Sequence, residues 1–193
     1  MLDNLSKYRI VLASNSPRRK QLLSGLGLDF DVRVLQDIDE SYPPSLLGED
    51  IPLHISRKKA EAYRADMAPD ELIITADTIV YVDGEVLGKP HDKADAERMF
   101  HLMSGRKHQV ITGVCILTAK KLVQFACTTE VAFAKLSDDE ISYYIDRYRP
   151  YDKAGAYGIQ EWIGYVGITG ITGSFFNVVG LPVQRLYTAL KEF

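Results

Sequence analysis

Two arginines in the first turn of a predicted helix are the clearest sign of chemistry in this sequence. Arg18 and Arg19 follow Ser16 and Pro17, where serine suits the N-cap and proline suits the first helical position. Cations at this end of a helix face the positive end of its dipole, which costs roughly 0.3–1 kcal/mol each. A bound anion reverses that sign, because backbone N–H groups and two guanidiniums then converge on it. The segment predicts a phosphate site, with two solvent-directed arginines as the alternative.

An aspartate inside an apolar, β-branched segment is the second unusual feature. Asp77 interrupts the stretch from Leu72 to Val82, LIITADTIVYV. Aspartate is depleted in strands, and its carboxylate is costly to bury. One interpretation is an acid at a bulge, paired with a structural cation. The other is a carboxylate directed into a cleft, where it ligates Mg²⁺ or orients a water molecule. The segment alone does not decide between them.

The other charged residues favour a hard cation over zinc. The four histidines show no metal-binding spacing: His54, His91, His101 and His108. The available ligands are carboxylates, which suit Mg²⁺ or a similar ion, chiefly Asp37, Asp39, Glu40 and Asp77. Two neighbouring lysines on a predicted helix are by default a solvated face, and periodicity does not separate them: Lys58 and Lys59.

Two glycine-rich stretches resemble nucleotide-binding motifs but have the wrong spacing. Gly84–Pro90 has three residues between its glycines and a proline after Lys89, whereas a Walker loop has four residues there and Ser or Thr after the lysine. Lys89 can still meet a phosphate as a point charge. The second stretch repeats glycine every three residues, which is not a dinucleotide fingerprint: Gly164, Gly167, Gly170 and Gly173.

The elements that must position these residues are both strands and helices. Strands are predicted at Arg9–Ala13, Phe30–Leu35, Glu71–Val82, Gln109–Leu117 and Leu122–Phe133, with a hairpin turn at Asp83-Gly84. Helices are predicted from Ser16 to Gly25, and over Ile51–Met67, Asp92–Met103, Asp138–Tyr148 and Pro182–Phe193. Gly155 to Gly180 is glycine-rich with interleaved aromatics. Strands separated by helices, with hairpins among them, predict a mixed, partly antiparallel α/β sheet flanked by helices.

Composition narrows the class of protein. The chain has 193 residues, 46% of them hydrophobic and 25% charged, which suits one α/β domain or two small lobes around a shared core. No apolar run approaches the ~20 residues of a membrane span, and a net charge of −3 argues against a large nucleic-acid footprint. Cys115 and Cys127 lack the spacing of a metal or redox motif, so we expect reduced thiols and a cytoplasmic protein.

Six segments, taken together and in order, resemble the Maf family of nucleotide pyrophosphatases, also described as septum-formation-inhibitor-like. Each alone is weak, but the ordered set spans nearly the whole chain and is highly specific. The segments are LASNSPRR (Leu12–Arg19), ADTIV (Ala76–Val80), VLGKP (Val86–Pro90), MSGRKHQVITG (Met103–Gly113), DKAGAYGIQ (Asp152–Gln160) and VVGLP (Val178–Pro182).

The resemblance implies an activity and a set of site residues. The activity is hydrolysis of a nucleoside triphosphate to the monophosphate and pyrophosphate, with Mg²⁺ or Mn²⁺ as cofactor. Carried over by position, the phosphate-binding residues are Ser14, Arg19, Lys59 and Lys89, with Lys89 also counted among the catalytic groups. Glu40 and Asp77 are the implied catalytic and metal-handling carboxylates. The implied fold is one Maf-like domain over residues 1–193, in two lobes with a central cleft, often as a homodimer.

The same resemblance indicates a pyrimidine substrate. Family subgroups differ at three positions that contact the base, here Arg18, Thr78 and Gln160, and this combination is similar to the subgroup that cleaves dTTP and UTP. The Gln160 amide can both donate to and accept from a pyrimidine's imide edge. One departure is Thr75, where family members often carry glycine or serine, so the larger side chain is expected to crowd the strand. Trp162 is a candidate for stacking on the base.

Two alternatives stay open at this point. The first is a nucleotide-sensing regulatory protein, linked to cell division, that binds without turnover. A pure binder needs phosphate-binding cations but no ionised carboxylate beside them, so Asp77 weighs mildly against it. The second is an enzyme of the same family that acts on a modified or a purine triphosphate.

Overall fold

The structure is a computed structural model that describes residues 2–193. These residues form a mixed α/β structure around one seven-stranded sheet. The strand order is β2-β1-β3-β5-β6-β7, and β4 pairs with β3 beside this path. Strand β1 is parallel to β2 and β3, whereas the β3–β4 and β6–β7 pairs are antiparallel. The strands are β1 Arg9–Leu12, β2 Asp31–Val32, β3 Glu71–Val82, β4 Glu85–Leu87, β5 Lys107–Leu117, β6 Leu122–Phe133 and β7 Ile168–Thr172. The predicted mixed sheet flanked by helices is confirmed.

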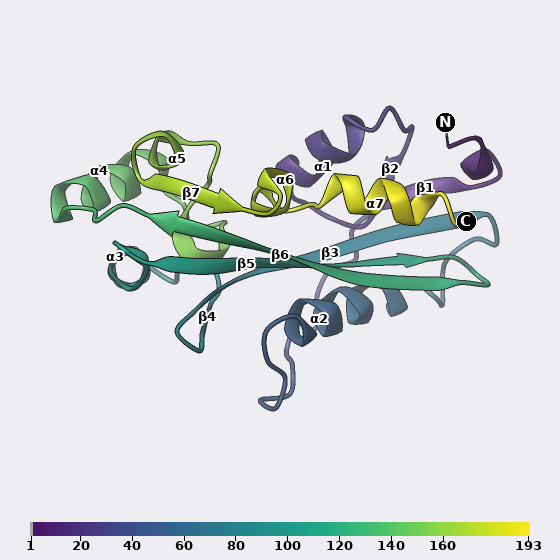
Figure 1. Cartoon of the computed structure of the whole chain (residues 1–193). Helices are drawn as coiled ribbons and strands as arrows, with labels where there is room; N and C mark the ends of the chain where they lie inside the picture. The colour runs from purple at the N-terminus through teal and green to yellow at the C-terminus, as the bar shows by residue number, and fades with distance from the viewer. Residues whose placement is uncertain (1) are drawn as a thin grey trace. The chain divides into compact units, whose positions relative to one another are not determined.

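The chain divides into two compact units, and the long strands β3, β5 and β6 contribute to both (Figure 1). Unit 1 comprises the described residues up to Asp77 together with Thr112–Cys127 and Gly180–Phe193. Unit 2 comprises Thr78–Ile111 and Thr128–Val179. None of the helices of residues 2–193 has the length and apolar character needed to cross a membrane.

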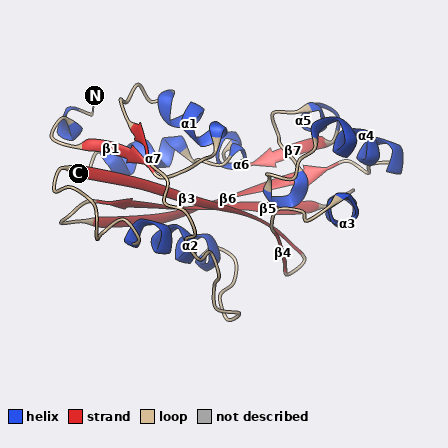
Figure 2. Cartoon of the chain, turned by 180° about the vertical axis from the view of Figure 1, so that it is seen from behind, coloured by secondary structure: helices blue, strands red, loops and turns tan. Residues whose placement is uncertain are grey.

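Unit 1 places helices on both faces of its part of the sheet. Helix α2 (Asp50–Glu61) covers one face, and α1 (Pro17–Ser24) and α7 (Val183–Leu190) cover the other, as both views show (Figures 1 and 2). Alternation along β3 supplies both cores, because successive side chains of a strand point to opposite faces. Leu72 and Ile74 pack in one cluster with residues of α1 and α7, and Ile73 packs in the other with residues of α2. Each of these side chains is fully buried, which is worth about 1.5–3 kcal/mol apiece.

Two contacts hold α2 close to the sheet. The buried Thr75 hydroxyl donates to the carbonyl of Ser56 at 2.6 Å, so this threonine fastens β3 to α2 and does not crowd the strand as expected. Gly113 on β5 lies against the start of α2, where an added Cβ would come within 2.4 Å of the Pro52 carbonyl group. The missing side chain at Gly113 is therefore what allows α2 to approach β5.

Two elements differ most from their predicted extents. Helix α2 stops at Glu61 instead of Met67, and the chain continues in turns through residue 66. The expected strand Phe30–Leu35 is reduced to Asp31–Val32. The buried Tyr63 lies in this turn, and its hydroxyl donates to the Arg33 carbonyl at 2.8 Å and accepts from the Leu35 N–H at 3.0 Å. Two backbone groups of the expected strand are therefore satisfied by a side chain, so the strand does not need to extend to Leu35.

Unit 2 confirms the predicted hairpin turn and two of the predicted helices. Asp83 and Gly84 both have positive φ, 49° and 87°, as a two-residue turn between β3 and β4 requires. Asp92 caps α3 (Lys93–Met103), and Ser137 forms a capping box at the start of α4 (Asp138–Tyr148). The glycine-rich stretch is more structured than its composition indicates. It forms the short helix η2 (Ala154–Ala156), α5 (Trp162–Val166), β7 and α6 (Phe175–Val179).

Two glycines of this stretch are required by the local structure. A Cβ on Gly164 would lie 1.8 Å from the Ile159 carbonyl oxygen, so only glycine fits there. Gly173 has a φ of 126°, a left-handed conformation that other residues rarely adopt. The short helix η1 (Asp3–Leu5) lies in unit 1.

Candidate active site

The start of α1 forms as the sequence predicts. Ser16 is the N-cap, and its hydroxyl accepts from the Arg19 N–H at 3.4 Å, with Pro17 in the first turn. Ser14, which follows β1 and is buried, accepts from the Ser16 N–H at 3.2 Å. The backbone between β1 and α1 is thus held by two serine side chains, which orients the N–H groups of the first helical turn.

Arg19 is anchored in the protein itself. Its Nε donates to the Gly180 carbonyl at 2.8 Å, and one terminal nitrogen donates to the Ala76 carbonyl at 2.9 Å. Burial lowers the pKa of Arg19, and the charges of Asp77 and Glu40 partly offset that effect. The alternative of two solvent-directed arginines is wrong for Arg19, because these two bonds hold its guanidinium against the end of β3. They also show that part of its stabilisation comes from backbone carbonyls and not from an anion.

Lys59 lies between the two predicted catalytic carboxylates. Its Nζ is 2.9 Å from Asp77 Oδ1 and 3.0 Å from Glu40 Oε1. Asp77 is on the same face of β3 as Ile73 and Thr75 by the two-residue period, which is the face that α2 covers. Helical spacing places Lys59 one turn after Ser56, the residue that Thr75 contacts. The Lys59 and Asp77 side chains are 15% and 12% exposed, so the pair is largely shielded from water.

The segment that carries Glu40 is fastened by a second ion pair, which the sequence did not indicate. Asp39 accepts from both the N–H and the hydroxyl of Ser41, and its Oδ2 lies 2.6 Å from the Nζ of Lys58. These bonds lower the pKa of Asp39, the bond from Lys58 most of all. The neighbouring lysines thus have different partners: Lys58 holds Asp39, and Lys59 holds Glu40 and Asp77.

Three predicted site residues belong to unit 2. Thr78 is half-buried on β3 directly after Asp77, Lys89 is exposed after β4, and Gln160 is exposed before α5. The segments that carry Lys89 and Gln160 are joined, because the N–H of Gly155 donates to the carbonyl of Gly88 at 3.0 Å. Gly155 also packs against Val80, where an added Cβ would come within 2.7 Å of a methyl carbon. Three of the quoted motifs, ADTIV, VLGKP and DKAGAYGIQ, therefore meet in unit 2.

Three further residues around Gln160 were missed. Tyr144, Lys153 and Glu161 form a polar cluster in unit 2, and only Lys153 lies inside a quoted motif. A burial signal was present in the sequence, since Tyr144 occupies the apolar face of a predicted helix, but its partners are distant along the chain. Trp162, the candidate for stacking on the base, packs edge-on against Tyr143 with ring centroids 4.9 Å apart.

The donor set of unit 1 fits a hard divalent cation. Glu40 and Asp77 offer carboxylate oxygens that already converge on one positive charge, the Lys59 ammonium. Among residues 2–193, no group of three or more acidic, histidine or cysteine side chains is placed to hold a metal ion. Mg²⁺ commonly takes one or two protein carboxylates, and completes its shell with water and substrate phosphate oxygens. Two converging carboxylates are therefore a sufficient protein contribution.

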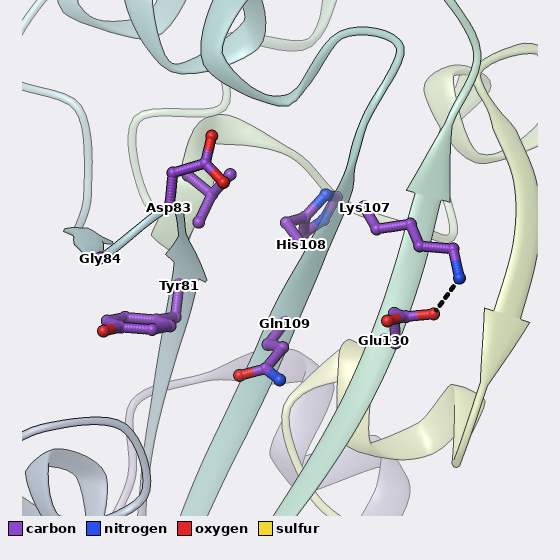
Figure 3. Close-up of a pocket in the computed structure, with 8 residues that line it drawn as sticks. Tyr81, Asp83, Gly84, Lys107, His108, Gln109 and Glu130 are labelled. Carbon is purple, nitrogen blue, oxygen red and sulfur yellow. Dashed lines mark ion pairs between the residues drawn. The ribbon is translucent and has the colours of Figure 1, made fainter.

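A pocket in unit 2 contains none of the predicted site residues (Figure 3). Its lining comes from the β3–β4 turn and the facing parts of β5 and β6: Tyr81, Val82, Asp83, Gly84, Lys107, His108, Gln109 and Glu130. Lys107 on β5 and Glu130 on β6 form an ion pair of 2.8 Å at one side of the pocket, and both side chains are well exposed. An exposed pair of opposite charges on a hairpin is an ordinary surface feature.

The sequence is similar to those of known proteins over nearly its whole length. The model of a family described as "Maf-like protein" matches residues 9–193. A dTTP/UTP pyrophosphatase of Parabacteroides distasonis is 63% identical over 193 residues, covering 100% of both chains. A dTTP/UTP pyrophosphatase of Phocaeicola vulgatus is 62% identical over 192 residues, again with 100% coverage of both. A dTTP/UTP pyrophosphatase of Flavobacterium psychrophilum is 48% identical and covers 94% of this chain and 93% of its own.

Proposed function

The chain belongs to the Maf family, and we propose that it hydrolyses dTTP and UTP, and modified pyrimidine triphosphates of the same shape, to the monophosphate and pyrophosphate. The relatives that match over the whole chain bear the name of this activity. The observation that carries the proposal is the convergence of Glu40 and Asp77 on one cation, in the same unit as the capped, arginine-bearing start of α1. A protein that only binds nucleotides does not need two carboxylates there.

The cationic groups account for triphosphate binding. The start of α1 offers N–H groups, the positive end of the helix dipole and the guanidiniums of Arg18 and Arg19. Ser14 holds the turn that presents them. We assign Lys59 and Lys89 to the phosphate oxygens as further cations. The Lys59 ammonium can leave a carboxylate oxygen and bind a phosphate oxygen instead, because both partners are negatively charged.

The carboxylates account for cleavage. We infer that Glu40 and Asp77 hold Mg²⁺ or Mn²⁺, which when bound supplies positive charge to the α- and β-phosphate oxygens. Asp77 orients the attacking water and keeps a carboxylate oxygen ready to take its proton. The water oxygen bonds to the α-phosphorus and the bond from that phosphorus to the bridging oxygen breaks, so pyrophosphate leaves with the electron pair. Cations stabilise the charge that develops on the leaving group, Lys89 among them.

The base is recognised by the three positions where the family subgroups differ. We assign the imide edge of the pyrimidine to Gln160, because one amide can donate to its carbonyl and accept from its N–H. Arg18 and Thr78 complete the set. An amide that bonds to the imide edge in this way disfavours cytosine, whose edge carries a different order of donors and acceptors.

The proposal is tested by analysing products. Purified protein with Mg²⁺ or Mn²⁺ is given dTTP or UTP, and phosphorus NMR follows the phosphates released. We expect monophosphate and pyrophosphate in equal amounts. Release of inorganic phosphate alone would identify a phosphatase and overturn the cleavage site. Tight calorimetric binding of dTTP with no product over hours would instead support a nucleotide-sensing regulatory protein.

We also propose a cytoplasmic enzyme that acts as a homodimer. Its two cysteines, Cys115 and Cys127, are free thiols, as suits a reducing compartment. The dimer rests on the resemblance to the family alone. Light scattering coupled to size-exclusion chromatography measures the mass in solution, and a mass near the 21.7 kDa of one chain would contradict it.

A further inference from the structure

The buried hydroxyl of Tyr144 holds the segment that carries Gln160. Tyr144 on α4 is fully buried, and its hydroxyl accepts from the N–H of Gly158 at 2.9 Å. The same hydroxyl donates to Oε2 of Glu161. These two bonds clamp the turn on both sides of Gln160, since Gly158 precedes it by two residues and Glu161 follows it directly.

A lysine completes the clamp. Nζ of Lys153 lies 3.2 Å from Oε1 of Glu161 and 2.7 Å from Oδ1 of Asp152, and the Lys153 side chain is only 10% exposed. The Glu161 carboxylate is thus held at one oxygen by a tyrosine and at the other by an ammonium. A shielded carboxylate with both oxygens engaged has few rotamers open to it.

The backbone of the same turn is equally constrained. The Glu161 N–H donates to the Gly158 carbonyl at 2.9 Å, and the Gly164 N–H donates to the Glu161 carbonyl at 2.9 Å. Ile159 is buried, and Gly164 packs against its carbonyl so closely that no side chain fits between them. Gln160, in contrast, is exposed. A rigid turn therefore presents one exposed amide.

We propose that Tyr144, acting through Glu161 and with Lys153, is a positioning residue that orients Gln160 for recognition of the pyrimidine base. The inference rests on the proposed function and deepens it. A glutamine side chain discriminates between imide and amidine edges only if its amide is held in one orientation, because a freely rotating amide offers a donor or an acceptor equally well. The bonds of Tyr144, Glu161 and Lys153 restrict the backbone on both sides of Gln160 before the base binds, so less conformational entropy is lost on binding.

The Tyr144 hydroxyl is suited to this task at any working pH. Burial and the bond to Glu161 raise the pKa of Tyr144, so its hydroxyl stays protonated and remains a donor. Its ring is held by neighbours on two sides, with Phe100 edge-on at 5.5 Å and Tyr148 stacked at 5.0 Å between centroids. Tyr144→Phe therefore removes the hydroxyl and keeps the packing.

The test compares Tyr144→Phe with Tyr148→Phe, a matched loss of one hydroxyl from the adjacent ring of the same helix. For each protein, kcat/KM is measured with UTP and with CTP, and the ratio of the two is the readout. We expect Tyr144→Phe to lower the UTP-to-CTP ratio about 5- to 10-fold, the size of one hydrogen bond. Tyr148→Phe should leave the ratio unchanged. Glu161→Gln should lower it in the same direction, since it removes the charge that Lys153 holds.

A double-mutant cycle separates positioning from a general loss of structure. In a Gln160→Ala background, Tyr144→Phe should have no further effect on the UTP-to-CTP ratio. An equal loss of kcat/KM for both nucleotides, or a full effect in the Gln160→Ala background, would overturn the inference. So would an unchanged ratio in a Tyr144→Phe protein with a native melting temperature. If Tyr144→Phe does not fold, Glu161→Gln is taken through the same cycle, and an unchanged ratio there overturns the inference. Failure of the wild type to release pyrophosphate would instead count against the proposed function.

Discussion

The Lys59 ammonium lies 2.9 Å from Asp77 Oδ1 and 3.0 Å from Glu40 Oε1, so a single cation separates two carboxylates. The three groups come from α2, β3 and the loop before α2, and they meet because Asp77 lies on the face of β3 that α2 covers. The position between the two carboxylates is therefore one that a positive ion stabilises.

Replacing Asp77 with asparagine should nearly abolish turnover and leave the protein folded. The amide keeps the shape of the side chain but loses the charge that orients water and attracts a metal ion, so we expect kcat to fall about 10²- to 10⁴-fold. Pyrophosphate release measures activity, and circular dichroism checks the fold. Asp66→Asn, an exposed residue of the same unit, is the control and should keep full activity. Retained activity in Asp77→Asn would remove Asp77 from the mechanism.

Replacing Lys59 with methionine should separate metal binding from substrate binding. Without the ammonium, Glu40 and Asp77 face each other uncompensated, so Mn²⁺ should bind the nucleotide-free protein several-fold more tightly. KM for dTTP should rise in the same variant, because one phosphate-binding cation is lost. Electron paramagnetic resonance measures free Mn²⁺, and Lys120→Met, an exposed lysine of unit 1, controls for net charge. Weaker Mn²⁺ binding in Lys59→Met would contradict the assignment of the metal to these two carboxylates.

Replacing Gln160 with alanine should relax the choice of base more than it slows the reaction. The lost hydrogen bonds to the imide edge should lower the UTP-to-CTP ratio of kcat/KM about 10- to 100-fold. Arg18→Ala should also change the ranking of a panel of triphosphates. Gln109→Ala, an exposed glutamine on β5 of the same unit, is the control. If the ranking is unchanged in both variants, Gln160 and Arg18 do not select the base. The proposed reaction class would not be affected by that result.

Replacing Gly113 with alanine should destabilise unit 1. The added methyl group would come within 2.4 Å of the Pro52 carbonyl, so α2 must shift away from β5 or the strand must bend. Overpacking of this kind costs about 1–3 kcal/mol, which urea denaturation can measure. Activity should fall as well, because α2 carries Lys59. Gly170→Ala on β7 meets no atom within 4 Å and should be neutral. Equal stability of the two variants would contradict the close approach of α2.

Stability should fall on acidification because of a buried histidine. Burial lowers the pKa of His108 from 6.5 to about 4, with Nε2 2.8 Å from the Tyr157 hydroxyl. The unfolded chain takes up the proton below pH 6.5, whereas the folded chain resists it until about pH 4. The contribution of His108 to the free energy of unfolding is therefore fully present above pH 6.5 and declines as the pH falls to about 4. Below that pH it does not change further, and the total loss is about 3 kcal/mol.

Denaturation of the wild type and of His108→Phe across this pH range tests the effect. The difference in unfolding free energy between the two should change with pH only inside the window. Parallel pH profiles for the two proteins would show that His108 does not titrate differently in the folded state.

The sequence by itself determined the parts of this protein that depend on neighbours along the chain. The cap at Ser16, the turn at Asp83-Gly84 and the full extent of β3 all form as predicted. Their geometry follows from residue type within a few positions, so a local pattern suffices. The ordered motifs likewise placed the chain in its family.

Only the tertiary structure decided which side chains meet. Nothing in the pattern distinguished Lys58 from Lys59, yet a rotation of about 100° per residue on α2 gives them different carboxylates. The same holds for Arg19, which is bound by carbonyls 57 and 161 residues away, and for Tyr144, which supports a turn 14 residues further on. These contacts depend on how sheet and helices pack, which is a property of the whole fold. Local periodicity indicates which face of a helix or strand is buried, but it does not indicate which residues pack against that face.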